Sequence, residues 1–258
     1  MEDISVIGEI VKKLQTPPTG RMSRNPCEIC QVDVRMPVLK AMQECAKRER
    51  RIYMSDCARL KTLWLNVLQE ANIQKRYINC NLPAIEARGI PESVKVQYKR
   101  VKAFIDNLIT NLACGKGLIL KGPTGTMKTT LAVAVLQEAL AMGESGLLIN
   151  MSSLLDKIFS MKDSKPESRL TFEQKLIECK LLVLDDLGTE YSEGWVQTKV
   201  NSIISERYDR MRSSIYTTNF TNEQLKASEG GRYADRIIDR FREDCEVINF
   251  TGKSLRRG

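Results

Sequence analysis

The chain has 258 residues, of which 42% are hydrophobic, so it can form one domain of medium size with a sizeable core and a smaller domain beside it. It contains 40 Lys and Arg, 32 Asp and Glu, and no histidine. The lack of histidine excludes Ser/His/Asp hydrolysis, an imidazole general base, and zinc sites that combine cysteine with histidine.

The cysteine content and the apolar pattern bear on the cellular compartment. Eight cysteines in 258 residues are far below the density of a disulfide-stapled domain, and residues 1–20 contain no apolar run framed as a signal peptide. No window reaches the roughly 20 apolar residues that a membrane-spanning helix needs. We therefore expect a soluble cytoplasmic protein with reduced thiols and no membrane partner.

Positive charge is concentrated near the amino terminus. Residues 1–100 hold 18 basic and 11 acidic side chains, whereas residues 101–258 hold 22 and 21. This excess favours a surface for nucleic acid or for an acidic partner in the first hundred residues. A solvated helix face is the alternative explanation.

The amino-terminal part is predicted to be mostly helical. From Arg59 to about Tyr77, apolar residues recur at steps of three and four, which indicates an amphipathic helix. Between Asn81 and Pro91, two prolines and one glycine favour a linker. The predicted division is 1–80 for a small Cys-containing domain, 81–95 for the linker and 96–258 for the second domain.

The second domain shows the pattern of an α/β fold. Helical periodicity from Ser93 to about Leu112 gives way to short apolar runs that alternate with helical stretches. Such runs are typical of buried parallel strands joined by crossover helices, so we predict a parallel sheet flanked by helices. The predicted strands are 117–120, 146–149, 181–184, 214–218 and 247–250.

A glycine loop between the first predicted strand and the next helix indicates a phosphate-binding site. In such a loop, backbone N–H groups and the helix N-terminus face the phosphates. Lys128 would neutralise the β- and γ-phosphates, and the Thr129 hydroxyl would ligate Mg²⁺. An ordinary strand–loop–helix turn is the alternative. The predicted loop comprises Gly122, Pro123, Thr124, Gly125, Thr126, Met127, Lys128, Thr129 and Thr130.

Met127 departs from the usual motif, which has glycine immediately before the lysine. If this position needs a positive φ, a side chain there costs about 1–2 kcal/mol of strain. Its Cβ must point away from the phosphates. A cost of this size would weaken nucleotide binding about tenfold.

Polar residues follow two further predicted strands. Asp185 and Asp186 end a buried strand, where ligands of open α/β sheets gather. Asp185 would hold Mg²⁺, and Asp186 would accept a proton from, or orient, the attacking water. Asn219 ends the next strand and would hold that water or a γ-phosphate oxygen. A helix cap for the aspartates and a simple turn for Asn219 are the alternatives.

Three arginines recur at four-residue steps near the carboxyl terminus, at Arg232, Arg236 and Arg240. Surface ion pairs with Asp235 and Asp239 are one explanation. The other is an arginine finger that stabilises transition-state charge on the nucleotide of a neighbouring subunit.

In this order, the motifs resemble those of AAA+ ATPases of the DnaC/DnaI helicase-loader group and the related IstB transposition helper. The resemblance covers residues from about 75 to 258 and rests on GPTGTMKTT at 122–130, LLVLDDLG at 181–188, ERYDRMRSSIYTTN at 206–219 and ADRIIDRFR at 234–242. It implies Walker A roles for Lys128 and Thr129, Walker B roles for Asp185 and Asp186, sensor I for Asn219, and the arginine finger for Arg240 with Arg236 beside it.

The amino-terminal cysteines resemble a zinc segment that some relatives carry. Cys27 and Cys30 form a first pair, but the second pair is incomplete around Cys45. Cys57 could complete an all-thiolate site with four ligands. A decayed site with free thiols is the alternative.

The resemblance implies an ATPase that uses ATP and Mg²⁺ to load a replicative hexameric helicase onto single-stranded DNA. The amino-terminal domain would hold the helicase, and the ATPase domain would bind DNA and self-associate. Met127, together with Asp186 at a position where many AAA+ enzymes have glutamate, favours slow hydrolysis gated by DNA or a partner. The alternatives are an IstB-like transposition helper that binds duplex DNA and a nucleotide-binding adaptor with little hydrolysis.

Overall fold

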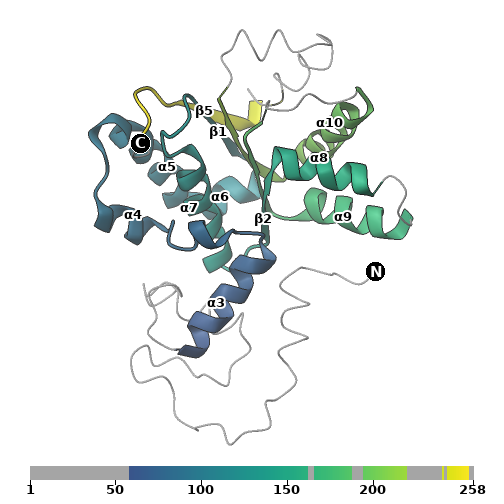
Figure 1. Cartoon of the computed structure of the whole chain (residues 1–258), viewed down its shortest axis with the longest axis horizontal. Coiled ribbons are helices and arrows are strands. Elements are labelled where there is room, and N and C mark those ends of the chain that lie inside the picture. The colour runs from purple at the N-terminus through teal and green to yellow at the C-terminus, as the bar shows by residue number, and fades with distance from the viewer. Residues whose placement is uncertain (1–57, 162–165, 188–193, 220–239, 241–242, 256–258) are drawn as a thin grey trace, which may run out of the picture.

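The computed structural model describes residues 58–161, 166–187, 194–219, 240 and 243–255 (Figure 1). Within them, five strands form one parallel sheet, as predicted, and their order in the sheet is β2-β3-β4-β1-β5. Their bounds are β1 Gly117–Lys121, β2 Gly146–Asn150, β3 Leu181–Asp185, β4 Ser213–Thr218 and β5 Cys245–Asn249.

Helices cover both faces of the sheet, as Figure 1 shows for α4, α5 and α7 on one side and α8, α9 and α10 on the other. The α-helices described are α3 Ala58–Glu70, α4 Leu82–Arg88, α5 Lys95–Asp106, α6 Leu108–Ala113, α7 Lys128–Ala141, α8 Met151–Ser160, α9 Pro166–Glu178 and α10 Gly194–Asp209.

Alternation along the strands separates two apolar cores. In β1, Leu118 and Leu120 pack with α3 to α7, whereas Ile119 between them packs with α8 to α10. Helix α7 is buried throughout from Leu131 to Ala141, which explains why its residues there are apolar except for Gln137 and Glu138. The sheet therefore lies in the middle of three layers, and the loops at its carboxyl edge remain available for a ligand.

The amino-terminal helices differ from the sequence prediction at their ends. Helix α3 stops at Glu70, and Asn72 adopts the left-handed conformation with φ 58°. The segment expected to be a linker contains α4, because Asn81 caps that helix and Pro83 lies in its first turn, where a missing N–H costs nothing. Helices α3 and α4 pack in the same core as α7. The division at residues 80 and 95 remains a prediction, since residues 1–57 lie outside those described.

Both outer strands of the sheet are covered by segments from the amino-terminal half. On β2, the Leu148 N–H donates to the Ala71 carbonyl at 2.9 Å, and the Asn72 amide donates to the Leu148 carbonyl at 2.8 Å. On β5, Gln97 donates to the Asn249 carbonyl at 2.9 Å. These contacts occupy edge groups that would otherwise be open to pairing with another strand.

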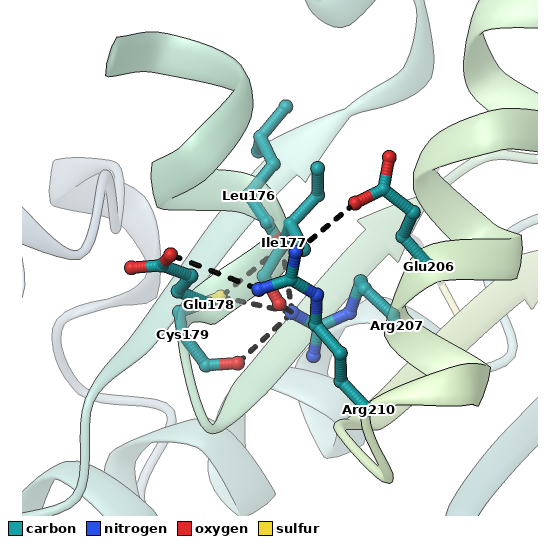
Figure 2. A network of polar contacts seen from close by, with 7 residues as sticks. All are labelled: Leu176, Ile177, Glu178, Cys179, Glu206, Arg207 and Arg210. Carbon is teal, nitrogen blue, oxygen red and sulfur yellow. Dashed lines mark hydrogen bonds and ion pairs between the residues drawn. The ribbon is translucent and has the colours of Figure 1, made fainter. Parts of the chain in front are cut away.

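Arg207 of α10 is buried, with 1% of its surface exposed, and joins three elements near the start of β3 (Figure 2). It donates to the carbonyls of Leu176 at 2.6 Å and Cys179 at 2.9 Å, and to the Ser214 hydroxyl at 2.9 Å. Leu176 lies in the last turn of α9, where a backbone carbonyl has no N–H partner within its own helix. Arg207 therefore ties the end of α9 to the start of β4. Burial also raises the pKa of the Cys179 thiol, which keeps it neutral beside the guanidinium.

No helix in the described ranges combines the length and the apolar character that crossing a bilayer requires.

Candidate nucleotide-binding site

The glycine loop joins β1 to α7 at the carboxyl edge of the sheet, and the carboxyl-terminal segment lies against it. The Leu255 N–H donates to the Gly125 carbonyl at 2.9 Å. A Cβ on Gly122 would lie 2.2 Å from the Phe250 carbonyl oxygen, and one on Gly125 would lie 2.0 Å from the Ser254 hydroxyl oxygen. Both glycines are therefore needed for this close approach, and both have a positive φ. Sequence analysis did not predict the contact.

Met127 does occupy the left-handed region, with φ 68° and ψ 11°. Its half-buried side chain packs against the core formed by α3 to α7. Full burial of a methionine side chain contributes about 1.5–3 kcal/mol, so the partial burial of Met127 offsets part of the strain of about 1–2 kcal/mol. The strain is already present in the folded chain, so binding a phosphate in this loop conformation adds none at this residue.

Lys128 begins α7 and has 5% of its surface exposed. Its ammonium donates to the Gly122 carbonyl at 2.8 Å, the Pro123 carbonyl at 2.7 Å and the Asn219 amide oxygen at 2.8 Å. These acceptors carry no formal charge. A phosphate oxygen in place of one of them would make a stronger, charge-assisted hydrogen bond.

Thr129 and Asp185 form the part of the site that fits a metal ion. The Thr129 hydroxyl donates to Oδ1 of Asp185 at 2.7 Å, and a second hydroxyl, from Thr217, donates to the same oxygen at 2.7 Å. Asp185 is buried, with 6% of its surface exposed. Hydroxyl and carboxylate oxygens are the ligands that Mg²⁺ prefers. Thr129 and Asp185 would hold the ion beside Lys128.

Asp186 turns away from Asp185. With φ 59°, its backbone leaves the strand direction directly after β3, and its N–H donates to the Thr217 hydroxyl at 2.9 Å. The Asn150 amide at the end of β2 lies 3.4 Å from Oδ2 of Asp186. The two adjacent carboxylates thus have different partners, which reduces their repulsion.

Asn150 and Thr217 are site residues that sequence analysis missed. The signal that could have found them is a polar residue at the carboxyl end of an apolar strand, the same signal that picked out Asn219. Asn150 also caps α8, because its side chain accepts the Ser152 N–H at 3.0 Å.

Arg240 lies away from the loop of its own chain. Its ion pair with Asp209 measures 3.9 Å, its guanidinium lies 5.2 Å from the centre of the Tyr208 ring, and it hydrogen-bonds the Ser205 hydroxyl. All three partners belong to α10. Five further residues of the predicted sites lie outside the described part of the chain, namely Arg236, Cys27, Cys30, Cys45 and Cys57.

Comparison with known proteins identifies the family. Residues 84–258 match the model of the IstB-like ATP binding proteins. The chain belongs to this family. The match, together with the parallel sheet, makes it a P-loop AAA+ protein, which confirms the resemblance found in the sequence.

Relatives of this IstB-like protein include helicase loaders and an insertion sequence ATP-binding protein. The replicative helicase loader DnaC of Escherichia coli (strain K12) is 26% identical over 172 residues, which span 65% of this chain and 66% of the relative. The insertion sequence ATP-binding protein y4pL of Sinorhizobium fredii (strain NBRC 101917 / NGR234) is 28% identical over 204 residues, or 75% and 82% of the two chains. The crystal structure of a DnaC helicase loader superimposes with a TM-score of 0.58 and 28% identity, covering 69% of this chain and all of that one.

Proposed function

We propose that this protein is an ATPase that binds ATP with Mg²⁺ and loads a replicative hexameric helicase onto single-stranded DNA. The observation that carries the proposal is a set of two hydrogen-bonded pairs at the carboxyl edge of the sheet, Lys128 with Asn219 at 2.8 Å and Thr129 with Asp185 at 2.7 Å. The similarity to helicase loaders supports the choice of substrate.

The proposal assigns a separate role in nucleotide binding or hydrolysis to each residue of the site. Lys128 exchanges a loop carbonyl for a phosphate oxygen, while the N–H groups that begin α7 face the same phosphates. Mg²⁺, when bound, neutralises phosphate charge. The Asp186 carboxylate, beside Asn150 rather than Lys128, orients the attacking water. The Asn219 amide oxygen keeps its hydrogen bond from Lys128, and its NH2 group can donate to that water or to a γ-phosphate oxygen.

Self-association would complete the site. Arg240 packs against α10 and not against the glycine loop of its own chain. We therefore infer that it reaches the nucleotide of a neighbouring subunit. Arg240→Ala should then bind ATP normally but lose turnover. Mixing it with Lys128→Ala, which keeps the arginine, should restore part of the turnover, because mixed assemblies contain intact sites. Full turnover by Arg240→Ala alone would remove the assignment.

The insertion-sequence ATPase is a second candidate, and the coverage of y4pL favours it, since that match spans more of both chains than the match to DnaC. Copurification with a hexameric replicative helicase, followed by binding to single-stranded and duplex DNA of equal length, separates the two. A stable helicase complex with preference for single strands supports the loader. No complex and a preference for duplex supports the transposition helper.

Two further measurements on the same sample address the remaining alternatives. ATP binding without turnover, even with DNA and helicase present, would favour the nucleotide-binding adaptor. Zinc analysis tests the four-cysteine site, and one zinc per chain that is lost in Cys27→Ser would support it.

A further inference from the structure

Thr217 lies at the end of β4 and contacts three successive residues at the end of β3. Its hydroxyl donates to Oδ1 of Asp185 at 2.7 Å and accepts the Asp186 N–H at 2.9 Å. Its carbonyl accepts the Leu187 N–H at 2.8 Å. The side chain is fully buried, with 0% of its surface exposed. Thr217 is therefore linked to both Asp185 and the left-handed turn that follows it.

The position of Thr217 in the sheet explains why its side chain is used. Pairing of β3 with β4 ends at Leu184 and Tyr216, one residue before Asp185 and Thr217. Beyond that pair, the ladder with β4 no longer fixes the end of β3, whereas the ladder with β2 continues to the pair of Asn150 and Asp185. At this point the Thr217 hydroxyl links β4 to Asp185 through its side chain. The same hydroxyl accepts the N–H of Asp186, whose φ of 59° costs energy.

The two hydroxyls on Asp185 leave one carboxylate oxygen for a ligand. Thr129 from α7 and Thr217 from β4 both donate to Oδ1. Within the described ranges, the hydrogen bonds found at the Asp185 carboxylate all involve Oδ1 and none involves Oδ2. Two donors from different elements fix the plane of the carboxylate, and Mg²⁺ tolerates little deviation from octahedral geometry.

We propose that Thr217 is a positioning residue that orients Asp185 for Mg²⁺ and thereby sets the magnesium affinity of the site. The inference rests on the proposed ATPase function. Partners that orient metal ligands typically contribute tenfold or more to metal affinity. The nucleotide itself has no contact with Thr217 in this scheme, so its affinity at saturating Mg²⁺ should not depend on the hydroxyl.

Three variants of the full-length protein test the proposal. Thr217→Val keeps the shape but removes the hydroxyl, and Thr217→Ser keeps the hydroxyl. Thr218→Val is the matched control, because the Thr218 hydroxyl is also buried and donates to the Leu187 carbonyl at 2.7 Å rather than to Asp185. ATP binding and turnover are measured across a titration of Mg²⁺, and thermal unfolding is followed in parallel.

Thr217→Val is expected to raise the Mg²⁺ concentration for half-maximal turnover about tenfold and to lower kcat. Its KM for ATP at saturating Mg²⁺ should stay within about twofold of the wild type, and Thr217→Ser should restore the wild-type titration. Thr217→Val should lower the melting temperature more than Thr218→Val, because the Thr217 hydroxyl makes two hydrogen bonds, one of them to a carboxylate. A wild-type titration in Thr217→Val, or an equal shift in Thr218→Val, would overturn the proposal. Absence of nucleotide binding by the wild type at every Mg²⁺ concentration would instead overturn the ATPase function, and the role of Thr217 with it.

Discussion

Lys128 and Arg207 are both buried cations held by oxygen atoms, but they lie at opposite ends of the sheet. The carbonyls that Lys128 contacts belong to Gly122 and Pro123, which are half-buried or exposed. Those that Arg207 contacts belong to Leu176 and Cys179, which are buried. Water or a phosphate can therefore replace the contacts of Lys128, whereas nothing replaces those of Arg207.

This difference separates a binding cation from a structural one. A buried acceptor that loses its donor costs about 1–3 kcal/mol, while an acceptor that water can reach costs much less. Burial alone therefore does not reveal a functional residue. A functional cation is recognised by partners that water or a ligand can replace. Variants at Lys128 and Arg207 can test this distinction.

The largest effect on stability is expected at Arg207. Arg207→Met keeps the length of the side chain but removes the guanidinium donors from the carbonyls of Leu176 and Cys179 and from the Ser214 hydroxyl. The free energy of unfolding should fall by at least about 3 kcal/mol, measured by urea denaturation. Arg210→Met is the control, because the ion pairs of this exposed neighbour within the described ranges are those with the carboxylates of Glu178 at 3.8 Å and Glu206 at 3.3 Å (Figure 2). It should cost less than about 1 kcal/mol. Equal losses in the two variants would contradict a structural role for Arg207.

Lys128→Ala should have the opposite profile. ATP affinity, measured by calorimetry with Mg²⁺ present, should fall at least about 100-fold, which corresponds to roughly 2.7 kcal/mol. The free energy of unfolding without nucleotide should change by about 1 kcal/mol or less, because the loop carbonyls gain water. A loss of stability as large as that of Arg207→Met, with ATP affinity retained, would reverse the roles assigned to the two cations.

Met127 is expected to give the smallest effect. Met127→Gly relieves the strain at φ 68° but loses the packing of the side chain, whereas Met127→Ala loses the packing and keeps the strain. The glycine variant should be more stable than the alanine variant by about 1 kcal/mol. Since the conformation exists before nucleotide binds, ATP affinity should stay within about threefold for both variants. A tenfold gain for Met127→Gly would show that binding, rather than folding, carries the strain.

Much of the sheet could be predicted from the sequence, because buried parallel strands are short apolar runs. Strands β1 to β4 lie where such runs occur, whereas β5 begins at Cys245, two residues before its predicted start, and is largely exposed at the edge of the sheet. The prediction of helix boundaries failed at residue types that occur both in loops and at helix ends. Pro83 lies in the first turn of α4 instead of preventing a helix there. Asn107 divides the single helix expected between Ser93 and Leu112 into α5 and α6.

The site was predicted in part for a related reason. The glycine loop and the acidic strand end have local signatures, and the structure brings Lys128, Thr129, Asp185 and Asn219 together. The contact of Ser254 and Leu255 with the loop joins segments more than 120 residues apart, and no local pattern marks it. The roles of these four site residues remain predictions, as do those of Asp186, Arg240 and the amino-terminal cysteines.

The most direct test is a crystal structure with a non-hydrolysable ATP analogue and Mg²⁺. The account predicts that the Lys128 ammonium has left at least one of the carbonyls of Gly122 and Pro123 to contact the phosphates, with Mg²⁺ near Asp185 and the contacts of Arg207 unchanged. An empty loop at saturating analogue, or Lys128 still bound to both carbonyls with the nucleotide elsewhere, would contradict it.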